Sequence, residues 1–464
     1  MSNIINPSAV DIRKIDLRGA TGTFDLSDNF IELSVYENIF QPALTAHITL
    51  TDSFNFAAKL PIVGEETLDI IFSLEGVDDD DDASIFLPPM HVNDISSRFM
   101  TKPKSQQYSL ELVSEQFMNN AHSTISKSYR GKTVQQIVED IYLSHLDDEH
   151  ENSEGITTES TDGIENIIIP NLHPHDAIRW LSQRTLAATS NAINFIYYET
   201  MSGSRFVSIN NLVEQEPILT FTQSPAAEDA FKIESLSAGI IKYDKISFVK
   251  QFDKYVNTKR GLYASKLITH DIVKKKIVQH EYTGFNEWFG ISHLGIFPPL
   301  SNSETEIKKS SRKSFAPSAT EFPSIDESEL GNQVDSHIEF YPKHNQMYSL
   351  NTGDIYDNKV EDWKLQRNGH MEIYNGLKVM IECAGVSFLK IGSTVKLLIT
   401  SPETTDRDGT MFDGYEKYLS GKWLVSEIRH ILTQKDDIQY RMVVILIKDG
   451  LEDIVPLRET RKED

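Results

Sequence analysis

Two stretches far apart in the chain decide the fold: residues 60–72, LPIVGEETLDIIF, and residues 388–399, FLKIGSTVKLLI. Each begins with apolar residues, reaches a turn glycine (Gly64 or Gly392) and continues as an alternating segment of the kind that forms a β-strand. Internal similarity constrains an architecture more tightly than a single motif does. We therefore interpret the two stretches as equivalent parts of a duplicated β-domain.

The segments that follow these stretches match in the same order. Residues 92–98 lead to a strand that contains Tyr108, and residues 425–430 lead to a strand that contains Tyr440. The second copy has a longer acidic loop at residues 403–413. This order predicts two similar tube-like antiparallel β-barrels within a single chain.

Short alternating segments, separated by turn residues, occupy the first part of the chain. Six short strands in about a hundred residues are typical of a small barrel or sandwich. The predicted strands are residues 12–17, 30–36, 44–50, 68–72, 92–99 and 108–113.

The period of the apolar residues changes between residues 116 and 225. Apolar side chains recur at helical spacing along residues 133–142, where Thr133 and Gln136 form a capping box. A second helix is predicted with Asp176 as its N-cap. Two strands, residues 192–198 and 206–209, complete a compact α+β module.

The whole chain is predicted to be α+β and mainly β, with two tube-like barrels flanking the smaller α+β module. A hairpin is expected at residues 262–283 and a short helix at residues 358–367. The predicted division is a first tube-like barrel (1–115), the α+β domain (116–225), the start of the second barrel with its hairpin (226–300), an extended or loosely ordered insertion (301–345), completion of the second barrel (346–452) and a charged tail (453–464).

Composition excludes several classes of protein. The 464 residues carry a net charge of −24, which disfavours gripping of nucleic acid or an anionic membrane because such partners need clustered Lys and Arg. One cysteine, Cys383, permits no intrachain disulfide and no thiolate zinc site, and its apolar surroundings predict a buried small hydrophobe. No secretion signal and no membrane anchor are recognised in the sequence.

Candidate chemical sites receive structural interpretations. His173, His175 and Asp176 suggest a metal site, but a Pro174-marked turn into a helix is favoured because no further ligand cluster completes the set. Neighbouring Glu65 and Glu66 are expected to point to opposite faces and so to be unable to flank one glycosidic bond. We predict no catalytic, cofactor-binding or metal-binding residues and no cofactor.

Three charged segments are likewise interpreted as solvated. The five aspartates of Asp78–Asp82 repel one another and predict an exposed loop, with calcium binding as the less favoured alternative. Residues 406–413 resemble a calcium loop only superficially, because their glycine is misplaced. Lys274–Lys276 predict a hairpin turn, whose favoured binding partner, if it has one, is an acidic protein patch.

Taken together, several segments resemble the central baseplate hub proteins of contractile phage tails. The opening barrel is similar in VYENIF (residues 35–40), LTDS (residues 50–53) and LPIVGEE (residues 60–66). Later parts are similar in the helix at residues 131–142, in residues 175–198, and in the ending from LSGKWLV (419–425) to IKDG (447–450). The order of several weak motifs carries this resemblance.

The resemblance implies a homotrimeric ring in which two barrels per chain give a pseudo-hexameric torus that adapts the sixfold tail tube to the threefold spike. The implied partners are the tail tube or tube-initiator protein, the central spike protein and neighbouring baseplate proteins, with DNA only in transit. The hub itself is expected to be no enzyme, to be assembled in the host cytoplasm and to reside in the virion. The alternatives are a tail-associated cell-wall hydrolase and a type VI secretion spike base; the latter ranks lower because no β-helical repeat is present in the sequence.

Overall fold

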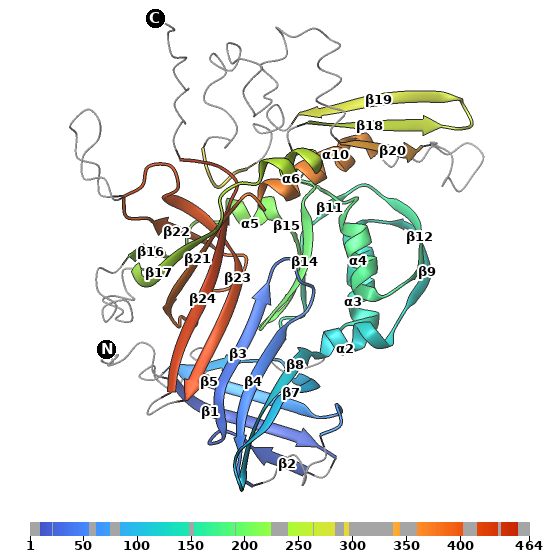
Figure 1. Ribbon diagram of the computed structural model, residues 1–464. Helices are drawn as coiled ribbons and strands as arrows, with labels where there is room; N and C mark the ends of the chain where they lie inside the picture. The colour runs from blue at the N-terminus through green and yellow to red at the C-terminus, as the bar shows by residue number, and fades with distance from the viewer. Residues whose placement is uncertain are drawn as a thin grey trace, which may run out of the picture.

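Strands dominate the molecule, as predicted (Figure 1). The computed structural model describes residues 10–20, 22–54, 62–74, 84–147, 153–190, 192–223, 240–262, 264–283, 292–296, 337–343, 360–401, 415–434 and 438–452. Within these residues the mainly β prediction is confirmed.

The first part of the chain forms an antiparallel sheet in the order β2-β1-β5-β7-β8-β4-β3, with β6 paired to β5. Its side chains alternate between a buried and a more exposed face, as the sequence pattern predicts: in β4, Ala46, Ile48 and Leu50 are buried. The strands are β1 (Val10–Gly19), β2 (Gly22–Asp25), β3 (Phe30–Asn38), β4 (Thr45–Asp52), β5 (Thr67–Leu74), β6 (Ser84–Phe86), β7 (Met90–Lys102) and β8 (Ser105–Ser114).

The last part of the chain forms a closed barrel of six strands in the order β23-β22-β16-β17-β21-β24, which pairing of β23 with β24 completes. The strands are β16 (Thr220–Gln223), β17 (Ile240–Lys250), β21 (Leu377–Ala384), β22 (Thr394–Leu398), β23 (Gly421–Gln434) and β24 (Ile438–Lys448). Strand β16 precedes residue 226, so the barrel begins before the boundary expected from the sequence.

The two sheets share one strand order. We leave out the short strands β2 and β6 and number the six strands of each unit in chain order. The strands of the first sheet are then arranged in the order 1-4-5-6-3-2, which is β1-β5-β7-β8-β4-β3. The barrel strands have the same order, which is β16-β22-β23-β24-β21-β17. They differ in two respects. The β16–β22 pair is parallel whereas β1–β5 is antiparallel, and the ladders of the described residues close the second sheet but leave β1 and β3 unpaired with each other.

Two β-bulges recur at equivalent places. The β7–β8 ladder shifts between Val92 and Asp94, and the β23–β24 ladder shifts between Val425 and Glu427. A bulge inserts one extra residue into one strand and is a specific feature of the local pairing rather than a defect. The second shared bulge lies between Phe30 and Glu32 in β3 and between Tyr243 and Lys245 in β17.

The turn glycines also match, but the tyrosines do not. Gly64 and Gly392 precede β5 and β22 with φ of 97° and 78°, a left-handed conformation that side chains disfavour. Ile95 faces Leu110 and Ile428 faces Val444, so the ladders make Met442, not Tyr440, the equivalent of Tyr108. The alignment of the two tyrosines was therefore wrong by two residues, which leaves both side chains on the buried face.

The segment between the sheets is an α+β module (Figure 1, cyan to green). Its predicted capping box is confirmed: the Thr133 hydroxyl accepts from the backbone N–H of Gln136, whose side chain accepts from Thr133 N–H. The elements are α2 (Glu115–His122), β9 (Ile125–Lys132), α3 (Val134–His145), β10 (Ile156–Thr158), β11 (Thr161–Asp162), β12 (Glu165–Leu172), α4 (Pro174–Ser182), β13 (Leu186–Ala187), β14 (Phe195–Thr200), β15 (Gly203–Ser208) and α5 (Ile209–Glu214).

The predicted cap of α4 was wrong. The helix begins at Pro174 with His173 as the N-cap, and Asp176 lies in the first turn instead. Proline at the first helical position has no N–H to leave unpaired, so the helix starts three residues earlier than it would with an Asp176 cap.

A separate three-stranded sheet, in the order β19-β18-β20, packs on a long helix. It contains the predicted hairpin, and it recruits β20 from the predicted insertion, of which residues 301–336 lie outside the described residues. The elements are α6 (Lys254–Lys259), β18 (Ala264–Asp271), β19 (Lys276–Thr283), β20 (Ile338–Pro342) and α10 (Val360–Ile373).

Candidate functional site

The junction between the two sheets is the principal candidate site, because it fixes one β-unit against the other. Strand β3 pairs with β23 along seven residue pairs, from Asn38–Glu427 to Glu32–Thr433. The sheet therefore continues from the first unit into the barrel (Figure 1). On its outer face Arg429 pairs with Glu32 at 3.0 Å and lies over the ring of Tyr36.

The inner face of the junction contains a buried polar network. Nε2 of His430 lies 3.0 Å from Oε2 of Glu37, and Nδ1 lies 2.7 Å from the Tyr440 hydroxyl. In the tautomer with the proton on Nε2, His430 donates to the Glu37 carboxylate and accepts from the Tyr440 hydroxyl at Nδ1. The other oxygen of Glu37 accepts the backbone N–H of Met201 from the α+β module. One network thus joins all three parts of the chain.

A second buried carboxylate ties the α+β module to the first sheet. Glu199 in β14 accepts the backbone N–H of Leu44 at 2.8 Å and the hydroxyl of Ser114 at 2.5 Å. Its exposure is 2%, so it bridges two elements of the first sheet from inside the protein. Buried hydrogen-bonded groups of this kind specify a unique arrangement of the elements they connect.

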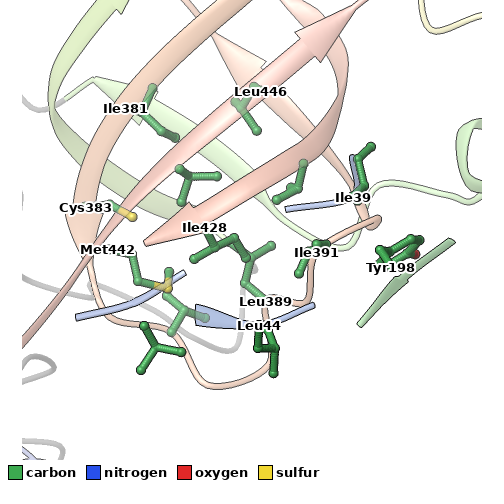
Figure 2. Close-up of a cluster of buried hydrophobic side chains, with 14 of the residues drawn as sticks. Ile39, Leu44, Tyr198, Ile381, Cys383, Leu389, Ile391, Ile428, Met442 and Leu446 are labelled. Carbon is green, nitrogen blue, oxygen red and sulfur yellow. The ribbon is translucent and has the colours of Figure 1, made fainter. Parts of the chain in front are cut away.

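Buried apolar side chains from both sheets and from β14 form one cluster at the junction (Figure 2). Ile39 and Leu44 come from the loop after β3, Tyr198 from β14, and Leu389 and Ile391 from the segment before β22. They pack with barrel side chains such as Ile381, Ile428, Met442 and Leu446 in one continuous core. The two sheets and β14 are therefore held together by a shared hydrophobic core rather than by a flexible linker.

Among the described residues, the two edges that correspond to the internal β3–β23 junction remain open. Strand β7 pairs with β5 only through Met90 and His91, and beyond them only with β8. Strand β17 pairs with β16 only through residues 240–243, and beyond them only with β21. These edges carry exposed apolar residues, namely Phe99, Met100, Phe248 and Val249. By the shared strand order, β17 is the equivalent of β3 and β7 the equivalent of β23.

The three residues that were considered as a metal site, and for which a structural role was favoured, do not converge on one point. The His173 ring lies against the backbone carbonyls of Asn120 and Ser123, His175 is buried, and Asp176 is exposed. Burial lowers the pKa of His175 to about 4 and keeps its ring neutral. In the described residues, no group of three or more His, Cys, Asp or Glu side chains is arranged to hold a metal ion.

The glutamate pair has the structural role expected of it. The carboxylate of Glu66 is buried and accepts the backbone N–H groups of Val63 and Gly64, while Glu65 is exposed. Cys383 is 1% exposed in β21, and burial raises its thiol pKa to about 12, which confirms the small-hydrophobe interpretation.

The remaining charged segments fall into two groups. Lys274–Lys276 form the exposed end of the β18–β19 hairpin, as predicted. Asp78–Asp82, the loop at residues 403–413 and the tail at residues 453–464 lie outside the described residues. Among helices of the described residues, none is long and apolar enough to cross a membrane.

Sequence analysis missed the residues of the buried network. Glu37 stands at the end of a strand, and His430 lies between Ile428 and Leu432 on the inward-facing alternation of β23. A titratable residue at an inward position was the available signal, because such a group needs a buried partner. The partner, 393 residues away in the sequence, could be identified only from the fold.

Comparison with known proteins gives matches at the level of structure. No protein-family model matches the sequence, and no match is found among curated proteins. A tail protein from Neisseria meningitidis MC58 aligns over 94% of this chain and 97% of its own, with a TM-score of 0.50 and 8% identity. The 43 kDa tail protein of prophage MuSo2 from Shewanella oneidensis aligns over 95% and 99%, with a TM-score of 0.50 and 9% identity.

The chain has the fold of these tail proteins. The match covers nearly the full length of each chain, so it includes both sheets and the α+β module between them. The resemblance to phage tail proteins that was drawn from the sequence is thus confirmed for the fold.

Proposed function

We propose that this protein is the structural hub of a contractile phage tail baseplate, a homotrimeric ring that adapts the sixfold tail tube to the threefold central spike. Its other partners would be a tube or tube-initiator protein and neighbouring baseplate proteins. It would reside in the virion after assembly in the host cytoplasm and catalyse no reaction. The tail-protein fold supports this reading.

One observation carries the proposal: two sheets of one strand order are already joined edge to edge, and the equivalent edges, formed by the parts of β7 and β17 that pair on one side only, are open among the described residues. If β17 of one chain pairs with β7 of the next as β3 pairs with β23, a head-to-tail contact repeats around a ring. Three chains then present six similar units. Pairing would also remove two unpaired edges, which are otherwise prone to aggregation.

Charge is compatible with the passage of DNA through such a ring. The chain has a net charge of −24, and acidic surfaces repel phosphates instead of binding them. DNA would be in transit, without a specific binding site.

The purified protein is expected to form a species of about three times the 52.7 kDa chain mass. Replacing Val249, which is 54% exposed on the open edge, with lysine should reduce the trimer to monomer because a charged edge strand resists pairing. Ile168→Lys is the matched control, since Ile168 is 71% exposed on the distant strand β12. Native mass spectrometry would measure both. A monomeric wild type, or equal loss of trimer in both variants, would contradict the proposed ring.

Disulfide trapping tests the same contact independently. Ladder partners place Ser96 and Lys250 where Arg429 and Tyr36 face each other in the internal junction, because Val249 is the extra residue of a second bulge in β17. The Ser96→Cys, Lys250→Cys double variant should therefore oxidise to a covalent ladder that stops at three chains. Wild-type Cys383 is buried and should give no ladder. A ladder that continues beyond three chains would contradict closure.

A cell-wall hydrolase would instead release soluble fragments from purified peptidoglycan. The hub proposal predicts no such release by the isolated chain, and clear turnover would refute it.

A further inference from the structure

A cavity of about 450 Å³ lies between α4, β14 and α10, beside the loop at residues 39–42. It is unrelated to the strand edges discussed above. Its size falls in the range of pockets that hold small organic molecules. Its apolar walls include Phe40, Tyr197 and Trp363. Its polar wall contains Arg179 from α4 and Arg367 from α10.

Neither arginine, Arg179 or Arg367, has an anionic partner among the residues that the structure describes. Arg367 is half-buried and donates to the backbone carbonyls of Ile193 and Phe195 and to the Ser182 hydroxyl, which are all neutral. Burial, together with the positive charge of Arg179, lowers the pKa of Arg367 to about 10. The side chain of Arg179 makes no hydrogen bond or ion pair within the described part of the chain.

Other charges of the lining do not neutralise the pair. Lys364 is engaged by Glu339 at 3.1 Å. Asp176 is the one carboxylate among the described lining residues, and no ion pair joins it to either arginine. Arg179 is exposed and Arg367 is half-buried, so an anion that enters between them would be attracted by two positive charges.

A third polar side chain, that of His175, lines the same cavity, and its Nε2 atom has no hydrogen-bond partner among the described residues. His175 is 8% exposed, and its Nε2 atom is buried without a hydrogen bond. An unsatisfied buried nitrogen costs free energy that a bound ligand atom can recover. Because Nε2 is not accessible to water in this structure, the neutral His175 ring would have to turn toward the cavity before Nε2 could donate to a bound anion.

We propose that this cavity binds a carboxylate group carried on an apolar stem. The planar guanidinium of Arg179 matches two carboxylate oxygens, and the aromatic walls match the stem. The carboxylate can come from a free organic acid or from a Glu side chain of a protein partner, and the two sources share one chemistry. The proposal does not depend on ring formation.

Calorimetric titration of the full chain with phenylacetate tests the proposal, with phenylacetamide as the uncharged ligand of the same shape. We expect binding of phenylacetate but not of the amide. Arg179→Gln should weaken binding about tenfold or more, because a charge-assisted hydrogen bond is lost. Arg179→Lys should retain part of it. Arg130→Gln, the same change on an exposed position of β9, should leave binding unchanged.

The peptide acetyl-Ala-Glu-Ala-amide separates the two sources. If it binds wild type and loses affinity in Arg179→Gln, the site accepts a protein carboxylate, and if only phenylacetate does so, the ligand is a free acid. Absence of binding by both carboxylates would overturn the proposal. So would equal binding of phenylacetamide, or an Arg179→Gln variant that is folded by circular dichroism and binds phenylacetate as tightly as wild type.

Discussion

Replacing Trp423 with alanine is expected to lower the free energy of unfolding by about 3–5 kcal/mol, because a large buried ring is lost from the barrel core. Trp423 is fully buried in β23, and its indole N–H donates to the Leu419 carbonyl at 2.8 Å. Its ring also faces the ammonium of Lys448, which is buried and donates to Glu452. Loss of the indole would remove the ring that covers the Lys448–Glu452 ion pair and would also remove apolar contacts in the core.

Guanidinium chloride unfolding followed by circular dichroism measures this change. Trp423→Phe is the matched comparison: it keeps most of the ring but leaves the Leu419 carbonyl without its donor, and should cost about 1–2 kcal/mol. A loss below about 1 kcal/mol for the alanine variant would show that the barrel does not depend on this side chain.

Replacing Glu37 with alanine is expected to cost about 3 kcal/mol, because two buried donors lose their acceptor. Those donors are Nε2 of His430 and the backbone N–H of Met201. Glu37 is 3% exposed, so water cannot readily replace its carboxylate. The lost free energy of unfolding should come mainly from a weaker contact between the first sheet and the barrel, because this network connects them.

Glu32→Ala is the control for that experiment. It removes a carboxylate from the same β3–β23 ladder, but its ion pair with Arg429 is solvent-exposed and should contribute less than about 1 kcal/mol. Urea unfolding of both variants gives the comparison. Equal losses would mean that the buried network adds nothing beyond an ordinary surface pair.

Local features of the fold were predictable because their causes lie within a few residues. The stripe of Val134, Ile137, Val138 and Ile141 is buried as the helical spacing predicts, and the Thr133 cap forms. The alternating segments of the first sheet became strands with boundaries shifted by a few residues. The start of α4 was wrong because Pro174 and Asp176 compete as helix-start signals, and proline prevailed.

Long-range features were predictable only in part. The repeat around Gly64 and Gly392 correctly indicated equivalent strands, yet an alternating pattern leaves the register undetermined by two residues, and so Tyr108 was aligned incorrectly with Tyr440. Pairing of β20 with β18 crosses a long segment of polar sequence, which periodicity alone could not connect. The cavity near Arg179 combines helices almost two hundred residues apart, so it required the fold.

Because β3 and β23 belong to one polypeptide chain, their pairing does not depend on protein concentration. Their pairing is unimolecular, with an effective concentration in the millimolar range that is typical of tethered partners, and so dilution leaves it intact. A ring of three such chains has β-unit contacts of two kinds, the β3–β23 contact within each chain and the proposed β17–β7 contact between chains. The contacts within chains would form as each chain folds, and only the contacts between chains would depend on subunit concentration. Assembly would then proceed from prepaired double units and would require far fewer encounters than a ring of six separate subunits.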